Sequence, residues 1–220
     1  FRDEDARGDR SPGEFYQLDM EMSFATQDDV FAVIEDVLPP IFAKYGTYNI
    51  ASQPPFRRIK YLDALETYGS DKPDLRIDLT AVNVTELFAE SEFAPFAGQT
   101  VKAVPITDCA LTRKQIEKLL TDCEVQSGQK GYWFKVDEQG EIAGGVAKFI
   151  NKEAIAQKFE LKPNMLVVLA AGEQATKAIG VMIKTFGANV PGHMDKERYE
   201  FCWIVDFPMY EIGDESGELE

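Results

Sequence analysis

The sequence predicts an α+β protein, in which strand hairpins and amphipathic helices pack against one another in layers. Three observations support this fold class. Polar and apolar residues alternate from Phe15 to Phe24, as they do in a half-buried strand. Apolar stripes with helical spacing follow Thr26 and Thr112 and occur again from Glu173 to Phe186. Between these stretches, short strands and short helices interleave.

The first 24 residues predict an antiparallel hairpin with a long charged loop. A short strand, Phe1–Asp5, is followed by turn-forming and charged residues from Arg7 to Gly13 and then by the alternating stretch. Its even positions are apolar, so we expect them to lie on a core: Tyr16, Leu18, Met20, Met22 and Phe24. Its odd positions combine a ring with amide and carboxylate groups, which indicates a ligand surface: Phe15, Gln17, Asp19, Glu21 and Ser23.

The polar groups of this hairpin suit a reacting nucleotide. Arg2 offers a planar fork of donors to a phosphate or a carboxylate. The ring of Phe15 can stack on a base. Asp19 and Glu21 can hold an ammonium group or Mg²⁺. A surface hairpin whose arginines and carboxylates neutralise each other explains the same pattern equally well.

Helices are predicted next. Thr26 and Asp29 form a capping box ahead of the first apolar stripe, and Pro39-Pro40 should kink or restart that helix. A short helix, Tyr61–Tyr68, should end at Gly69. The polar loop that follows, through Arg76, is expected to be structural.

The middle of the chain predicts a two-layer α+β module. A short helix at Thr85–Ser91 precedes a strand at Thr100–Ile106 and the helix capped by Thr112. The remaining elements are predicted as strands at Gly131–Val136, Ile142–Ile150 and Met165–Ala170, a helix capped by Asn151, a helix at Glu173–Phe186 that ends at Gly187, and a strand at Tyr199–Glu211 that is stopped by Pro208.

Composition limits the function classes. The formal net charge is −15, which argues against non-specific nucleic-acid binding by the chain as a whole. The three cysteines are widely spaced and the only histidine is His193, so no zinc-ligand spacing occurs and no metal site is predicted. We expect buried, reduced thiols and a solvated loop histidine. Without a signal peptide or an apolar run of spanning length, we expect a cytoplasmic protein that does not enter a membrane.

Three stretches carry a resemblance to a known family. Phe1–Phe24, with its Phe-Arg-Asp-Glu-Asp start, closely resembles motif 2 of bacterial-type aspartyl-tRNA synthetases, which are class II enzymes. The Tyr-led helix and Gly-Ser-Asp-Lys-Pro-Asp-Leu-Arg loop of Tyr61–Arg76, and the Trp-Ile-Val-Asp-Phe-Pro segment that begins at Trp203, also resemble this family.

The resemblance implies roles for individual residues. Arg2 is the catalytic arginine that contacts the α-phosphate of ATP and the carboxylate of the amino acid. The implied ATP-binding residues are Arg2, Asp3, Glu4, Ser11 and Phe15, with Phe15 stacked on adenine. Gln17 and Asp19, with Arg2, are implied to bind aspartate. The implied tRNA-side candidates are Arg7, Arg10, Lys72 and Arg76.

The resemblance also implies an organisation. We expect residues 1–84 to belong to the antiparallel catalytic sheet of the class II synthetases, 85–175 to be an inserted GAD-type domain, and 176–220 to return to the catalytic core. The chain is then expected to be a fragment that is inactive alone. Its parent would be a homodimer that uses ATP, Mg²⁺ and L-aspartate and charges tRNA-Asp, either alone or together with tRNA-Asn.

A second interpretation belongs to a different class of protein. The inserted region lacks chemistry of its own, so the chain is also consistent with a non-catalytic module that binds tRNA or protein and keeps motif 2 as a vestige.

Overall fold

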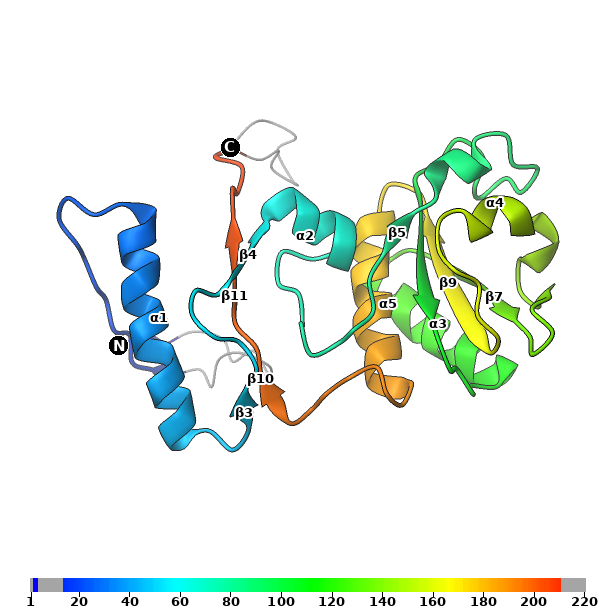
Figure 1. Ribbon diagram of the computed structural model, residues 1–220. Coiled ribbons are helices and arrows are strands. Elements are labelled where there is room, and N and C mark those ends of the chain that lie inside the picture. Colours follow the sequence, from blue (N-terminus) through cyan, green and yellow to red (C-terminus); the bar gives the residue numbers. More distant parts are fainter. Residues whose placement is uncertain (1, 4–13, 211–220) are drawn as a thin grey trace.

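The computed structural model describes residues 2–3 and 14–210 (Figure 1). The helices are α1 (Gln27–Tyr45), α2 (Tyr61–Tyr68), α3 (Arg113–Ser127), α4 (Lys152–Ala156) and α5 (Ala175–Asn189), with the 3-10 turns η1 (Thr85–Phe88) and η2 (Ala147–Phe149). The strands are β1 (Arg2–Asp3), β2 (Glu14–Phe15), β3 (Asn49–Ile50), β4 (Arg57–Lys60), β5 (Val82–Asn83), β6 (Val101–Ile106), β7 (Gly131–Val136), β8 (Ile142–Ala143), β9 (Met165–Ala171), β10 (Arg198–Tyr199) and β11 (Cys202–Val205).

A five-stranded sheet forms the larger part of the structure, and it confirms the predicted α+β class. Its strand order is β5-β6-β9-β7-β8, and every neighbouring pair is antiparallel. β9 is central and all seven of its residues are buried. A run of apolar residues without alternation is what a strand covered on both faces requires.

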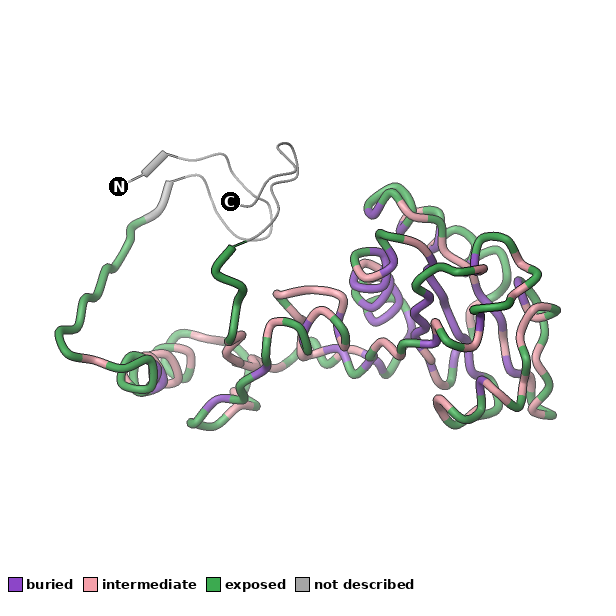
Figure 2. Tube along the Cα trace, turned by 90° about the horizontal axis from the view of Figure 1, so that it is seen from above, coloured by how far each residue is buried: buried purple, intermediate pink, exposed green. Residues whose placement is uncertain are grey.

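The two faces of this sheet are covered differently. Leu166, Val168 and Ala170 of β9 face the core formed with α3 and α5. The alternate residues of β9 face a second core, which contains Phe88 of η1 and Ile155 of α4. The predicted two-layer arrangement is therefore wrong in one respect: helices cover one face, and short turns with α4 form a third layer on the other. Figure 2 shows the buried residues of this unit gathered in its strands and in α5, which lies at one side of them.

α5 packs mainly with α3 and one face of the five-stranded sheet. Its buried side chains include Ile179, Met182 and Phe186, which belong to the same core as α3 and one face of β9. A domain boundary at residue 175 would separate α5 from this core. The packing supports a unit that continues through Asn189.

Two predicted terminations are corrected. α5 does not end at Gly187, because this residue is helical and a Cβ there would lie 2.5 Å from Cγ2 of Ile77. The absence of a side chain at Gly187 allows α5 to pack closely against Ile77. The predicted strand at Ile142–Ile150 is only the two residues of β8, because Gly144 and Gly145 adopt positive φ and turn the chain toward Trp133.

The part of the chain outside this unit contains α1, α2 and two parallel strand pairs. β3 pairs with β10, and β4 pairs with β11. The predicted strand at Tyr199–Glu211 is thus divided in two, and β11 ends at Val205, before Asp206 with its φ of 59°. The predicted Thr26 capping box is confirmed, whereas Pro39 and Pro40 lie inside a helix that continues through both.

His193 lies in the exit segment, which follows α5. This segment passes beside the entry segment, which contains Asp78 and leads into the five-stranded sheet. Its side chain is buried, with Nδ1 2.7 Å from Oδ1 of Asp78 and Nε2 2.9 Å from the carbonyl oxygen of Thr107. The expectation of a solvated loop histidine is wrong. The backbone of Asp78 also donates to the carbonyl of His193, so the entry and exit segments are joined at this point.

Glu35 joins α1 to the parallel strands. It is buried, and its Oε1 accepts hydrogen bonds from the backbone N–H of Phe56 at 3.0 Å and from Nε1–H of Trp203 at 2.7 Å. Trp203 also stacks on Phe31 of α1, with ring centroids 4.0 Å apart. The Glu35 carboxylate thus accepts hydrogen bonds from two N–H groups that the packing of α1 would otherwise leave without a partner.

We expect Glu35→Ala to lower the free energy of unfolding by about 2–4 kcal/mol, because the N–H groups of the buried Phe56 and the partly buried Trp203 lose their acceptor. Glu35→Gln keeps Oε1 and should cost about 1 kcal/mol or less. Urea unfolding followed by Trp203 fluorescence in a Trp133→Phe background measures both values. Equal losses in the two variants would contradict the role of Oε1.

An ion pair joins α2 to the five-stranded sheet. Nζ of Lys102 in β6 donates to Oε2 of Glu66 at 2.7 Å. Lys102 is 2% exposed, whereas the Glu66 side chain is 53% exposed. The hydrogen bond from Lys102 lowers the pKa of Glu66, although partial burial opposes this effect.

A lowered folded-state pKa stabilises the fold above the unfolded pKa of Glu66, and this contribution is lost as the pH falls through the folded pKa. We therefore expect Glu66→Gln to cost about 1–2 kcal/mol at neutral pH, a value reduced for the exposure of Glu66. The difference in the free energy of unfolding between Glu66→Gln and the unchanged protein should shrink at pH values below the ordinary glutamate pKa of about 4.3. Urea unfolding across this pH range tests it, with the exposed Glu153→Gln as control. A loss that does not change with pH would refute the assignment.

Candidate functional site

The predicted nucleotide-binding hairpin has a described backbone at its base. β1 pairs antiparallel with β2, and the register places Arg2 opposite Phe15 and Asp3 opposite Glu14. The hairpin prediction is therefore confirmed for these four residues. Glu4, Arg7, Arg10 and Ser11 were also predicted as site residues, and they lie outside the described residues.

The stretch that follows differs from its prediction. Residues 16–22 form no strand, and the even-numbered side chains are exposed, Tyr16 at 95% and Leu18 at 93%. Figure 2 shows this stretch running apart from the buried core. The expectation that Tyr16, Leu18, Met20, Met22 and Phe24 pack on a core is wrong for this chain. Alternation marks which side chains prefer burial, but the described part of the chain supplies no surface that covers them.

Gln17 and Asp19 lie together. Nε2 of Gln17 donates to Oδ1 of Asp19 at 2.5 Å, and both residues are exposed. Residues two positions apart in an extended chain share a side, which agrees with the predicted polar surface. The amide and carboxylate pair offers donors and acceptors to a small polar ligand.

Lys72 and Arg76 lie in the loop after α2. Nζ of Lys72 lies 2.5 Å from Oδ2 of Asp71. Arg76 forms a bidentate pair with Asp74, through Nε at 2.8 Å and a terminal nitrogen at 2.7 Å. This pair lowers the pKa of Asp74 and raises that of Arg76. The loop is thus fixed by its own ion pairs.

These two residues line a cleft with two cations that sequence reasoning missed. The cleft has a volume of about 530 Å³, and Lys184 of α5 and Arg198 of β10 also line it. Arg198 donates to the carbonyl of Leu75 at 2.6 Å and pairs with Glu200 at 2.8 Å. Lys184 and Arg198 come from separate elements, so no sequence motif connects them with the loop. The cleft thus brings four cationic side chains together with the carboxylates of Asp74 and Glu200, and three of the cations are in ion pairs.

Within residues 2–3 and 14–210, no three His, Cys, Asp or Glu side chains converge in a way that could hold a metal ion. The three cysteine thiols are free, and burial raises the pKa of each. In the same ranges, no helix has the length and apolar character needed to cross a membrane.

Comparisons with known proteins agree with the resemblance. An aspartate–tRNA ligase of Streptomyces coelicolor is 43% identical over 226 residues, which cover 100% of this chain and 38% of that protein. An aspartate–tRNA(Asp/Asn) ligase of Acidiphilium cryptum is 42% identical, and one of Rickettsia felis is 38% identical, each over the whole of this chain. The chain therefore spans about 38% of the length of these relatives.

The model of the class II tRNA synthetase family for D, K and N matches residues 1–216, nearly the entire chain. With the relatives above, this match shows that the chain belongs to the class II tRNA synthetases of the D, K and N group.

Proposed function

We propose that this chain acts as part of an aspartate–tRNA ligase, which activates L-aspartate with ATP to aspartyl-adenylate and transfers the aspartyl group to tRNA-Asp. The observation that carries the proposal is the similarity to aspartate–tRNA ligases over the whole of this chain, together with the hairpin in which Arg2 and Phe15 occupy paired positions. Some relatives carry a name that includes tRNA-Asn, so both tRNAs are candidate substrates.

The hairpin residues would work by orientation and charge neutralisation. In this proposal Arg2 bridges the aspartate carboxylate and the α-phosphate of ATP, so that the carboxylate oxygen attacks phosphorus while pyrophosphate leaves. Asp3, Glu4 and Ser11 help to bind ATP, and Phe15 stacks on adenine. Gln17 and Asp19 bind the substrate aspartate.

Mg²⁺ usually binds through substrate phosphates and one or two carboxylates, and we propose that it accompanies ATP. Asp19 and Glu21 are exposed carboxylates close in sequence to Gln17. When bound, the ion would neutralise charge on the pyrophosphate. The proposal also includes a homodimeric parent in the cytoplasm and a GAD-type domain formed by the five-stranded unit.

Aspartate-dependent ATP–pyrophosphate exchange tests the proposal. We expect the full-length protein to exchange with aspartate alone among the amino acids, and this chain alone to be inactive. Arg2→Ala in the full-length protein should lower kcat/KM by about 10²-fold or more, because a donor to the developing charge is lost. Arg113→Ala, which removes an exposed arginine of α3, serves as control. A full-length protein that is silent with every amino acid would favour the non-catalytic module.

The cationic cleft is proposed to contact the tRNA backbone, with Arg7 and Arg10 of the hairpin loop as further tRNA-side residues. We expect Lys72→Gln with Lys184→Gln to raise the KM for tRNA about three- to tenfold without changing pyrophosphate exchange, since each removes one phosphate-binding charge. The effect should weaken at high salt. Lys118→Gln, an exposed α3 lysine, is the matched control. An unchanged KM in the double variant would remove the cleft from the tRNA path.

A further inference from the structure

The five-stranded unit carries a surface that the aminoacylation proposal does not use. It consists of two cavities that share Phe149, whose ring stacks on that of Phe93 with centroids 4.5 Å apart. Phe149 lines both cavities. We call this surface the Phe149 groove.

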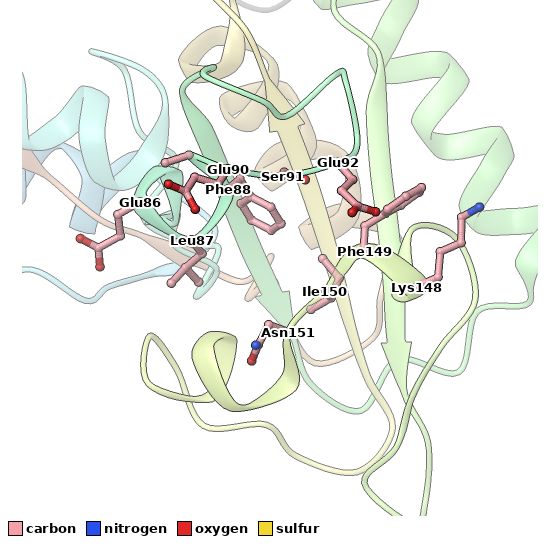
Figure 3. A pocket seen from close by; sticks show the side chains of 11 residues that line it. Glu86, Leu87, Phe88, Glu90, Ser91, Glu92, Lys148, Phe149, Ile150 and Asn151 are labelled. Atoms are coloured by element: carbon pink, nitrogen blue, oxygen red, sulfur yellow. The ribbon is translucent and has the colours of Figure 1, made fainter.

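The first cavity has a volume of about 600 Å³ and lies between η1 and the turn that joins η2 to α4 (Figure 3). Its base is the buried ring of Phe88, and its walls are the half-buried Leu87, Phe149 and Ile150. Figure 3 shows Glu90 on one side of this space and Glu92 on the other, beside Phe149. The cavity therefore combines apolar walls with carboxylates, and its lining is more polar than apolar overall.

The second cavity is lined by both Phe93 and Phe149. Its volume is about 410 Å³, and Tyr132 and Trp133 of β7 line it, with Glu117 and Glu124 of α3. The ring of Tyr132 meets that of Phe93 edge to face at 5.4 Å. Two adjacent aromatic cavities with acidic rims favour a ligand that has two cationic groups.

The charged side chains that line the two cavities also favour a ligand with two cationic groups. Five carboxylates line the two cavities, against the ammonium groups of Lys148 and Lys130. Two of the carboxylates are paired, Glu86 with Lys158 and Glu117 with Arg113. In the described part of the chain, the other three form no ion pair: Glu90, Glu92 and Glu124. A cation that entered the first cavity would meet the unpaired carboxylates of Glu90 and Glu92 against one ammonium group, that of Lys148. In the second cavity, Glu124 and Lys130 contribute one charge of each sign.

The aromatic rings are able to hold a cation. Nζ of Lys148 lies 4.6 Å from the centroid of Phe149, and Nζ of Lys130 lies 5.8 Å from that of Tyr132. Both distances are within the range of cation–π attraction. The same rings therefore already attract ammonium groups of this chain, and Figure 3 shows Lys148 extending away from the Glu90 side of the cavity.

The edge of the sheet beside the groove favours an extended protein segment over a small cation. β7 pairs with β8 only at Lys135 and Val136, so in the described residues Gly131 and Tyr132 have no strand on their outer side. A peptide can align along such an edge and place alternate side chains into neighbouring pockets. A nucleic acid is disfavoured, because phosphates would face the carboxylates of the rim.

We propose that the Phe149 groove binds an extended protein segment that presents two lysine or arginine side chains next to apolar residues, one cation to each cavity. The five-stranded unit thereby binds a basic partner protein on a surface separate from the hairpin. This proposal does not depend on the proposed aminoacylation activity.

The test measures fluorescence anisotropy of this chain with a labelled peptide in which two lysines alternate with leucine and glycine. We expect saturable binding that Glu90→Gln with Glu92→Gln weakens about tenfold. Glu138→Gln with Glu173→Gln removes the same charge from exposed positions outside the groove and should weaken binding less than twofold. Phe149→Leu keeps an apolar side chain but loses the ring face, and it should weaken binding to the lysine peptide about threefold.

Amide chemical-shift mapping on the labelled chain separates lost binding from lost folding. We expect shifts confined to the groove when peptide is added, and an unchanged spectrum elsewhere in the variants. Three results would overturn the proposal: no saturable binding at about 1 mM peptide, the weak end of measurable affinity; equal weakening by the two double variants, which would mean general charge attraction; or displacement of the peptide by an RNA hairpin.

Discussion

Burial of β9 on both faces is the constraint on which most of this structure depends. A strand with seven buried residues exposes no backbone or side chain to water, so each face needs its own cover and each edge its own partner. β6 and β7 pair with the two edges of β9 and so provide partners for its backbone hydrogen-bonding groups. α3 and α5 cover one face, while η1, η2 and α4 cover the other. The boundary of the unit therefore follows from what β9 requires.

The rest of the chain is held to this unit by the packing of Ile77 and Leu79 into its core and by a few polar contacts. Glu66 compensates the buried ammonium of Lys102, and His193 bonds to Asp78 and Thr107 where the entry and exit segments meet. Further away, Glu35 fixes α1 to Trp203 and Phe56. Each of these groups is buried or has a buried partner, so each one specifies a particular arrangement at the cost of desolvation.

The two charged surfaces of the molecule have opposite chemistry. The cleft between the loop after α2 and α5 presents four cations, three of them already paired with carboxylates, and we propose that it contacts an anionic backbone. The Phe149 groove presents aromatic rings with a surplus of carboxylates and suits a basic segment. A net charge of −15 alone does not distinguish them, because binding depends on where charges lie.

The sequence by itself determined the local features and the family. The capping residues Thr26, Thr112 and Asn151, the left-handed Gly69 and the buried run of β9 were all readable, because each depends on neighbours in the chain. The α+β class and the Arg2–Phe15 hairpin followed from pattern and motif.

Only the tertiary structure decided which surfaces are covered and which distant side chains meet. It left the apolar stretch after Phe15 exposed, buried His193, and brought Lys184 and Arg198 to the loop of Lys72. The contacts of His193 and Arg198 join residues 86 to 123 positions apart, and the local spacing of side chains carries no information about such contacts.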